Sequence, residues 1–318
     1  MRISRRALGA TLLLPSPARA QEWPSRPIRL IVPWPAGGPT DLYGRALARE
    51  LGPLLPQPMV VENRTGATGM LGVSHVVRSP ADGHTLLVAN TTAVIGSVVS
   101  LGDAAPFDPL RDLAPIALFT ESASVLWVNP GLGIRSFEAL LARARDERQP
   151  RLAFGTTGGG SVSEQSVEQL ARHFRLDVTK VPYRGTAPQV TDLVAGHVQF
   201  GTADFPTAAG HFREGRLVPV LVIGRERLSE LPDIPTNAEL GLTKPDFTIW
   251  NGIFAPAGVA PPLLARLEAL VAHAAAAPGL RAIADGNGNR AIFQAGDAAR
   301  QRLTRDLGAR RAFAAEAS

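Results

Sequence analysis

The sequence predicts an α/β fold that is divided into two lobes. Short apolar runs typical of β-strands alternate with segments of helical periodicity, a pattern that favours sheets covered by helices. This alternation begins again after about residue 125, and 318 residues are enough for two domains of ordinary size. Three glycine-containing loops, each before a predicted helix, follow predicted strands.

The first part of the chain predicts a mostly parallel sheet covered by helices. The first strand is ended by Pro33, and the helix after it has Leu47 and Leu51 at helical spacing. Alternating strand and helix units favour parallel strand pairs. Strands are expected at residues 28–32, 59–62 and 85–89, with helices at 42–51 and in the segment ending at residue 77.

The later part repeats this pattern and closes with helices. Strands are expected at 125–128, 152–154, 198–203 and 217–223, with helices at 137–144, 162–174 and 190–194. Apolar β-rich residues at 247–254 then lead to helices at 263–277 and 298–315. No apolar run approaches the length of about 18 residues that a transmembrane helix needs, so none is expected.

The first twenty residues have the pattern of an export signal. Arg2, Arg5 and Arg6 form a basic start, an apolar stretch covers residues 7–14, and small residues at positions 18 and 20 predict cleavage after Ala20. The alternative is an ordinary amphipathic N-terminal helix. The paired arginines also match a twin-arginine signal, so the export route stays open.

Charge and cysteine content exclude several functions. Of the 33 basic residues, four lie in the predicted signal together with no acidic residue, which leaves 29 basic residues against 28 acidic ones. No basic tract with interleaved aromatic residues occurs, so nucleic-acid binding is not expected. The absence of cysteine excludes disulfides, thiolate metal sites and cysteine nucleophiles.

The glycine-containing loops predict an anion pocket. The helix that follows each loop begins with unpaired backbone N–H groups and about half a positive charge. Glycine allows a ligand to approach this backbone closely, so three such N-termini favour a bound anion, most simply a carboxylate. Asn90, Thr91 and Asp204 also follow strands, where open α/β sheets bind ligands. The three loops are residues 33–41, 155–161 and 183–188.

Two of these loops also have the sequence of a helix cap. Ser161 and Glu164 have the spacing of a capping box, and Thr186 and Gln189 have the same spacing with glutamine. The hydroxyl groups of Ser161 and Thr186 therefore either cap helices or face a ligand. In both cases the backbone N–H groups of the same turns are available to an anion.

Two acidic residues near these loops have two interpretations each. Asp41 either stabilises the helix dipole or orients a water molecule or a ligand donor. Asp204 lies at a strand end, and an unpaired carboxylate in an anion pocket is costly. It is therefore expected to accept from a ligand ammonium or hydroxyl group, or to hold a bridging water.

The sequence offers no catalytic constellation. Residues 159–163 lack the final glycine of a nucleophile elbow, and neither a phosphate-binding loop nor a zinc-protease motif is present. The six histidines are scattered without metal-ligand spacing, and the glycines at 158–160 do not form a dinucleotide fingerprint. We therefore expect a non-enzymatic protein with no metal and no cofactor.

Seven short motifs together resemble one family. The chain is similar to the solute receptors of tripartite tricarboxylate transporters, also called Bug receptors. The motifs occur in the family's order and cover nearly all of the predicted mature chain. They are residues 24–28, 33–41, 60–64, 82–86, 181–188, 231–236 and 254–258.

This resemblance implies a type II periplasmic-binding-protein fold, in which crossing hinge strands join two α/β lobes around a ligand cleft. Residues 21–124 with 245–318 would form lobe 1, and residues 125–244 would form lobe 2. Backbone amides and ordered waters would hold the ligand carboxylates. With the strand-end residues, the predicted ligand-binding residues are Ala36, Gly37, Gly38, Thr40, Asp41, Asn90, Thr91, Thr156, Thr157, Gly158, Ser161, Gly185, Thr186, Ala187 and Asp204.

The resemblance also implies the function. The expected protein is a periplasmic, monomeric receptor that binds a small organic acid and delivers it to permease subunits in the membrane. An alternative partner is a membrane signalling protein, for which the receptor would sense the ligand. Glu164-Gln165 stands where the family often has His-Leu, which leaves the identity of the ligand open.

Overall fold

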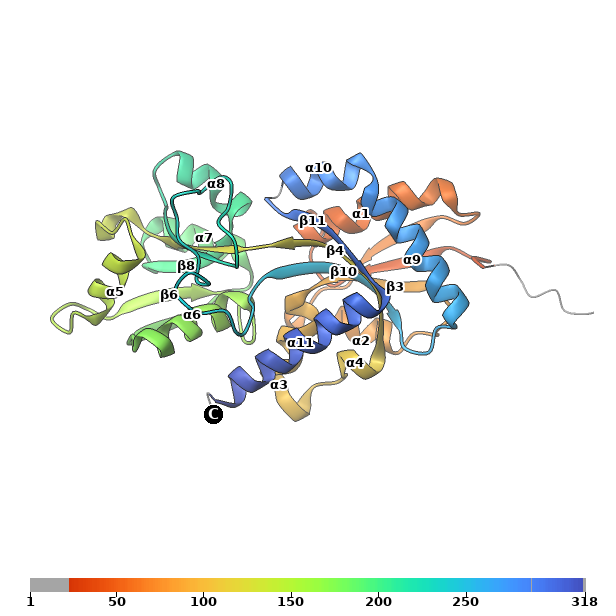
Figure 1. The fold of residues 1–318 in the computed structure, drawn as a ribbon, viewed down its shortest axis with the longest axis horizontal. Coiled ribbons are helices and arrows are strands. Elements are labelled where there is room, and N and C mark those ends of the chain that lie inside the picture. Colours follow the sequence, from red (N-terminus) through yellow and green to blue (C-terminus); the bar gives the residue numbers. More distant parts are fainter. Residues whose placement is uncertain (1–22, 287, 317–318) are drawn as a thin grey trace, which may run out of the picture.

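The computed structural model describes residues 23–286 and 288–316, which form two lobes side by side (Figure 1). We call lobe 1 the part built on a six-stranded sheet and lobe 2 the part built on a five-stranded sheet. The predicted export signal at residues 1–20 lies outside the described residues. The predicted lobe boundaries at 124/125 and 244/245 stay predictions.

The sheet of lobe 1 has the strand order β11-β4-β10-β3-β1-β2. Strand β1 pairs in parallel with β2 and β3, whereas β10 is antiparallel to both β3 and β4, and β11 is antiparallel to β4. The strands are β1 (Ile28–Val32), β2 (Met59–Asn63), β3 (Thr85–Asn90), β4 (Leu113–Ser122), β10 (Ile249–Pro256) and β11 (Arg290–Ala295).

The sheet of lobe 2 has the order β7-β6-β8-β5-β9. Strand β6 is parallel to β7 and β8, whereas β5 is antiparallel to β8 and β9. The strands are β5 (Ser124–Val128), β6 (Leu152–Thr156), β7 (Val178–Pro182), β8 (Phe200–Asp204) and β9 (Val218–Ile223).

The three strands expected in the first part of the chain, β1, β2 and β3, pair in parallel as predicted, but each complete sheet is mixed because antiparallel strands join it. The cause is the path of the chain between the lobes. Only Ala123 separates β4 from β5, so one extended segment leaves the first sheet and enters the second, and β10 returns beside it (Figure 1). In each lobe the strand that arrives from the other lobe, β10 in lobe 1 and β5 in lobe 2, runs against the strands of the βα units, which gives the antiparallel pairs.

The helices cover the sheets and largely match the sequence prediction. Helix α6 (Val162–Phe174) has the predicted bounds, and the helices after all three glycine-containing loops are present. Strands β4, β7 and β11 and helices α3, α4, α8 and α10 were not predicted. The remaining helices are α1 (Pro39–Leu51), α2 (Met70–Val77), α3 (Ser97–Leu101), α4 (Pro109–Asp112), α5 (Phe137–Arg145), α7 (Thr186–Ala195), α8 (Phe205–Arg213), α9 (Pro261–Ala276), α10 (Pro278–Gly286) and α11 (Gly296–Ala315).

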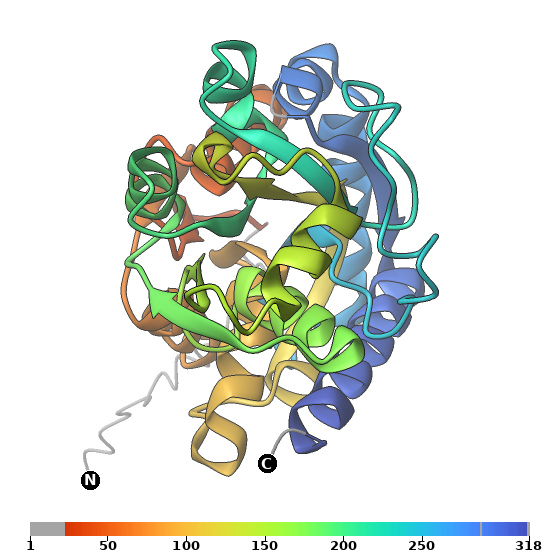
Figure 2. The same ribbon diagram turned by 90° about the vertical axis from the view of Figure 1, so that its left-hand side faces the viewer.

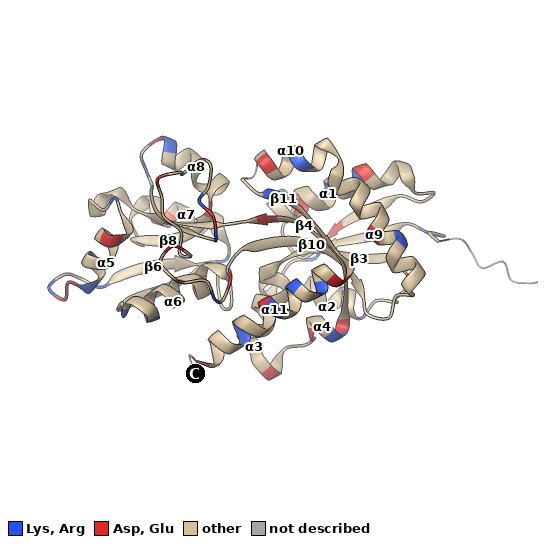
Figure 3. Ribbon diagram, viewed as in Figure 1, with Lys and Arg blue, Asp and Glu red and all other residues tan. Residues whose placement is uncertain are grey.

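Each lobe has its own apolar core on both faces of its sheet. In lobe 1, Leu30 and Val88 pack on one face, and Ile31 and Leu87 pack on the other. Successive strand residues point to opposite faces, so runs that are apolar throughout are buried on both sides. Charged residues are scattered over both lobes (Figure 3).

Helix α11 extends from one lobe to the other. Figure 1 shows it beneath the crossing strands, and Figure 2, viewed from lobe 2, shows it along one edge of the molecule. Leu303 and Leu307 lie in the core of lobe 1, whereas Phe313 packs in a core cluster of lobe 2 beside Phe247.

Within the described ranges, no single helix is both long and apolar enough to cross a membrane. Helices α9 and α10, which meet at a bend of 64°, pass that test only as a pair and only by length and composition. Leu267, Val271 and Leu280 of this pair are buried in the core of lobe 1.

Candidate functional site

The loop between β1 and α1 is shaped by the carboxylate of Asp41. Asp41 is fully buried and accepts hydrogen bonds from Gly37 N at 2.9 Å, Arg45 Nε at 2.8 Å and Asn63 Nδ2 at 2.8 Å. Burial by itself raises the pKa of Asp41, but the bonds from Arg45, Gly37 and Asn63 outweigh it and lower the pKa. The side chain thus holds the loop, whose Gly37 has a φ of +85°.

The same arrangement leaves two helix donors free. The amides of Gly38 and Leu42 donate within the turn, to Pro35 O and Gly38 O. The backbone amides of Thr40 and Asp41 have no protein partner among the described residues. They are the unpaired donors of the first turn of α1, and they can bind an acceptor.

A buried polar network joins this turn to the crossing strands. Thr40 Oγ1 donates to Asn251 Oδ1 at 3.0 Å, and Asn251 Nδ2 donates to Thr120 Oγ1 at 3.1 Å. Asn251 lies in β10 at an irregularity in its pairing with β4, and it stands opposite Asn90 of β3. The structure therefore brings Thr40 and Asn90 together around one strand.

Thr91 lies in the same region but is fully engaged with the protein. Its Oγ1 accepts from Trp250 N at 2.9 Å, and its side chain is buried. Asn90 Oδ1 accepts from Ala93 N at 3.1 Å. The Thr91 hydroxyl thus fixes β10 against the end of β3.

In lobe 2, a cluster of hydroxyl groups surrounds the N-terminus of α6. Ser163 Oγ lies within hydrogen-bond distance of Thr156, Thr157 and Ser161 hydroxyls and accepts from Thr157 N at 2.9 Å. Gly158, with a φ of +103°, provides the turn that brings these residues together. The amides of Val162 and Ser163 have no protein partner in the described part of the chain.

Of the two hydrogen bonds that the first predicted capping box would contain, only one is present. Ser161 Oγ accepts from Glu164 N at 3.2 Å, so Ser161 caps α6. Glu164 does not return the bond, because its carboxylate accepts from Lys180 Nζ at 2.7 Å on the neighbouring strand β7. An ion pair with a buried carboxylate outweighs the reciprocal cap.

The second capping box, at Thr186 and Gln189, was wrong. Gly185 is the N-cap of α7, with a φ of +119°, and Thr186 is already the first helical residue. Gln189 Nε2 instead donates to Thr202 O at 2.9 Å. The amides of Thr186 and Ala187 have no protein partner within the described residues.

Asp204 is the last residue of β8 and faces lobe 1. Burial raises the pKa of its carboxyl, and Thr207 Oγ1 donates to it at 2.7 Å. Burial is also the main cause that raises the pKa of the Tyr43 hydroxyl on α1, and the negative charge of Asp204 adds to it. The residues that follow Asp204 lie against lobe 1, because a Cβ atom placed on Gly288 would lie 3.2 Å from Pro206 Cδ.

The two lobes also touch directly at the glycine loop of lobe 2. A Cβ atom placed on Gly96 would lie less than 3.0 Å from Gly160 O, and one placed on Gly160 would lie equally close to Gly96 O. The contact is between backbones, so it tolerates no side chain on either residue.

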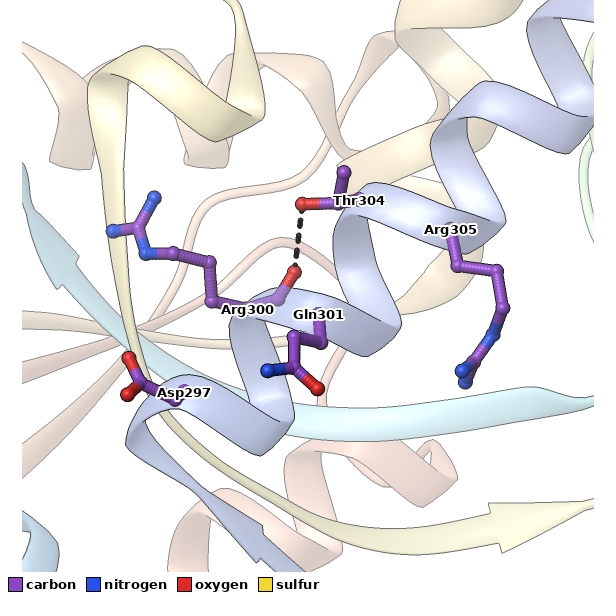
Figure 4. A pocket seen from close by; sticks show the side chains of 5 residues that line it. All are labelled: Asp297, Arg300, Gln301, Thr304 and Arg305. Carbon is purple, nitrogen blue, oxygen red and sulfur yellow. Dashed lines mark hydrogen bonds between the residues drawn. The ribbon is translucent and has the colours of Figure 1, made fainter.

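Two hollows on the surface contain none of the predicted ligand residues. One lies on the exposed side of α11, between Asp297, Arg300, Gln301, Thr304 and Arg305, where Thr304 Oγ1 donates to Arg300 O (Figure 4). The other lies beside α6 and β7. No group of three or more possible metal-ligand side chains occurs in the part of the chain that was described.

Two α/β lobes on crossing strands, with helix N-termini at their strand ends, define the class of periplasmic-binding-protein-like solute receptors. Within that class, the chain belongs to the tripartite tricarboxylate transporter receptor family: the model "Tripartite tricarboxylate transporter family receptor" matches residues 44–311.

Individual relatives agree with this assignment. Protein BugT of Bordetella pertussis is 35% identical over 259 residues, which are 81% of this chain and 79% of BugT. MatC of Rhodopseudomonas palustris with bound malate is 30% identical with a TM-score of 0.78, over 92% of this chain and 100% of MatC. Rpa4515 of R. palustris with adipate is 26% identical with a TM-score of 0.82, over 93% and 98% of the two chains. The periplasmic binding protein BugD, at 24% identity, shares the fold with a TM-score of 0.79.

Two residues of this region were missed by the sequence analysis. Ser163 is the centre of the hydroxyl cluster, and Asn251 connects α1 to the crossing strands. The sequence analysis assigned Ser161 and Glu164 to a capping box and gave Ser163 no role. No sequence motif marks Asn251, because its hydrogen-bond partners Thr40 and Thr120 are far away in the sequence.

Proposed function

We propose that this chain is an exported receptor that binds a small organic acid between its lobes and delivers it to a tripartite tricarboxylate-type permease. The observation that carries the proposal is the set of unpartnered amides at three helix N-termini. They are the amides of Thr40 and Asp41 on α1, Val162 and Ser163 on α6, and Thr186 and Ala187 on α7. An anion placed among them receives hydrogen bonds and three favourable helix dipoles.

A carboxylate is the anion that this chemistry and the relatives favour. The structures of MatC with malate and Rpa4515 with adipate contain dicarboxylic acids. Asp204 adds an acceptor on the side of lobe 2, which suits a ligand with a hydroxyl, an amine or a protonated carboxyl group. The Gly158 loop and Gly185 leave the backbone open to such a ligand.

The remaining parts of the proposal concern the export, processing and oligomeric state of the protein and the fate of its ligand. The chain is exported to the periplasm, is cleaved after Ala20, and acts as a monomer without turning over its ligand. Mass spectrometry of the protein from its native periplasm tests the cleavage, with a chain that starts at Gln21 as the expected result. Incubation with each bound acid tests turnover, with the acid recovered unchanged as the expected result.

A thermal-shift screen tests the binding function. Residues 21–318 are heated with a panel of mono-, di- and tricarboxylic acids and with the amide of each acid. A ligand at a hundred times its dissociation constant stabilises the folded state by about 2.7 kcal/mol. We expect a shift with an acid and none with its amide. No shift with any acid, for protein that mass spectrometry shows to be empty, would refute the proposal.

A further inference from the structure

Helix α11 is anchored in lobe 1 but ends in lobe 2. Its middle is fixed by the buried pair of Arg302 Nε and Asp306 Oδ2 at 2.8 Å, and Trp250 Nε1 of β10 donates to the same Asp306 oxygen at 3.0 Å. Its last turn places Phe313 in a core cluster of lobe 2. A single helix therefore bridges the two lobes below the crossing strands (Figure 1).

The last two turns of α11 meet a polar stripe on α6, the helix whose N-terminus belongs to the proposed site. The stripe consists of Gln165, Gln169 and Arg172, which share one helix face by their spacing. Arg310 Nη1 donates to Gln165 Oε1 at 3.4 Å, and Arg172 Nη1 donates to Phe313 O at 3.0 Å. Both glutamines are about nine-tenths or more buried.

The remaining residue of the stripe, Gln169, contacts the segment that returns to lobe 1. Gln169 Nε2 donates to Lys244 O at 2.8 Å. All three stripe residues thus bond to chain outside the strands and helices of lobe 2. An interface held by hydrogen bonds can exchange them for bonds to water when it separates, at a net cost of about 1 kcal/mol each. An apolar interface of the same area has no such replacement.

Arg310 is the least satisfied member of this interface. It is fully buried, its guanidinium lies 5.2 Å from the ring centre of Phe247, and its Nε and Nη2 have no partner among the described residues. Burial lowers the pKa of Arg310 to about 10. Stability alone does not account for a buried cation with unpaired donors, since an apolar residue of similar size often stabilises such a position.

We infer that the last two turns of α11, through Arg310 and Phe313, position α6 relative to lobe 1 and favour the arrangement in which the lobes meet. This inference rests on the proposed function, because it assigns the contact to the helix that offers Val162 and Ser163 amides to the ligand. Arg310 and Gln165 are positioning residues that do not touch the ligand. Gln165 is the acceptor for Arg310 Nη1.

Distances between spin labels on the two lobes test the inference without any ligand. The chain has no cysteine, so Arg49→Cys in lobe 1 and Arg148→Cys in lobe 2, both exposed, provide the only labelling sites. Gln165→Leu, Arg310→Met and Arg172→Met are compared in this background. The matched control is Arg300→Met, which removes a bond of the same kind, from Arg300 Nη1 to Leu110 O at 3.1 Å, inside lobe 1.

We expect the first three variants to lengthen the interlobe distance and to lower the closed-to-open ratio at least tenfold, about 1.4 kcal/mol. Arg310→Met should do so without lowering the melting temperature, which a merely structural residue would lower. Gln165→Glu should raise the ratio, because it offers a carboxylate to Arg310. The control should leave the distances unchanged.

Unchanged distances in Arg310→Met and Gln165→Leu would overturn the inference. An equal change in the Arg300→Met control would overturn it as well. Because the measurement uses ligand-free protein, a failure of the carboxylate screen leaves its result intact, and the two proposals fail separately.

Discussion

Gly96→Ala separates closure of the lobes from stability of the fold. Gly96 has a φ of −59° and a ψ of −44°, a right-handed helical conformation that alanine adopts readily. Alanine in a helix is more stable than glycine by about 0.5–1 kcal/mol. Its Cβ, however, would lie less than 3.0 Å from Gly160 O across the interlobe contact. The nearest atom outside the Gly160 backbone is Thr92 Cγ2 at 3.7 Å, an ordinary contact.

The magnitude follows from the two backbones that meet there. Ordinary Cβ contacts begin at 3.4 Å, and neither Gly96 nor Gly160 has a flexible side chain that could move aside. Extra atoms in a packed contact cost about 1–3 kcal/mol. If binding requires the lobes to meet, ligand affinity should fall by about 5- to 150-fold. The melting temperature of the ligand-free protein should stay the same or rise.

Calorimetry with the acid that gives the largest thermal shift measures this effect. Gly210→Ala is the control, because a Cβ on this α8 glycine meets no atom within 4 Å. The control should bind as the wild type does. Wild-type affinity in Gly96→Ala, with an unchanged interlobe distance, would refute the reasoning that these lobes close on the ligand at this contact.

Three further predictions concern single polar residues. Asp41→Asn should lower the melting temperature at pH 7, and the difference from the wild type should shrink as the pH falls below 3.8. The pKa of Asp41 is lowered in the folded protein, so its carboxylate stabilises the fold only while it is ionised. A difference in melting temperature that is independent of pH would contradict this role. Burial raises the pKa of Asp204, so the stability of the fold falls as the pH rises from 3.8 through the folded pKa. Asp204→Asn should therefore melt at a higher temperature at pH 7, and it should change the ligand preference in the screen. An unchanged melting curve and an unchanged ligand preference would contradict both the cost to stability and the role in ligand binding. Asn251→Ala should speed hydrogen exchange at Leu42 and weaken acid binding at least tenfold. The control is Asn237→Ala, which removes a similarly buried amide of lobe 2 that bonds Leu242 O and Gly224 N, and which should lower stability without changing affinity. Equal effects of the two substitutions on affinity would count against a role of Asn251 in positioning α1.

The parts of the fold that sequence could predict are local. The strands before the first two glycine-containing loops and the helix after each of the three follow from apolar period, proline and glycine within a few residues, as α6 illustrates with its matching bounds. Strand β4 was missed because Pro115 interrupts an apolar run that tertiary pairing with β10 nevertheless holds extended. The antiparallel direction of β5 and β10 was missed for the same reason, since the crossing of the chain between lobes sets it.

The candidate site divides in the same way. The predicted loops contain the unpartnered amides of Thr40 and Thr186, because a helix N-terminus leaves donors unpaired whatever surrounds it. The side chains were harder to predict, since their partners come from other elements: Glu164 bonds Lys180 of β7, and Thr40 bonds Asn251 of β10. Whether the loops converge on one ligand remains a prediction for experiment.

Calorimetric titration of wild-type protein with a carboxylic acid and with its amide tests the central claim most directly. The protein is first denatured and refolded so that no ligand from the cell remains. Helix N-termini that bind a carboxylate predict a one-to-one isotherm for at least one acid of the panel and no measurable heat for the corresponding amide. Equal binding of acid and amide, or no binding of any acid by correctly refolded protein, would contradict the account.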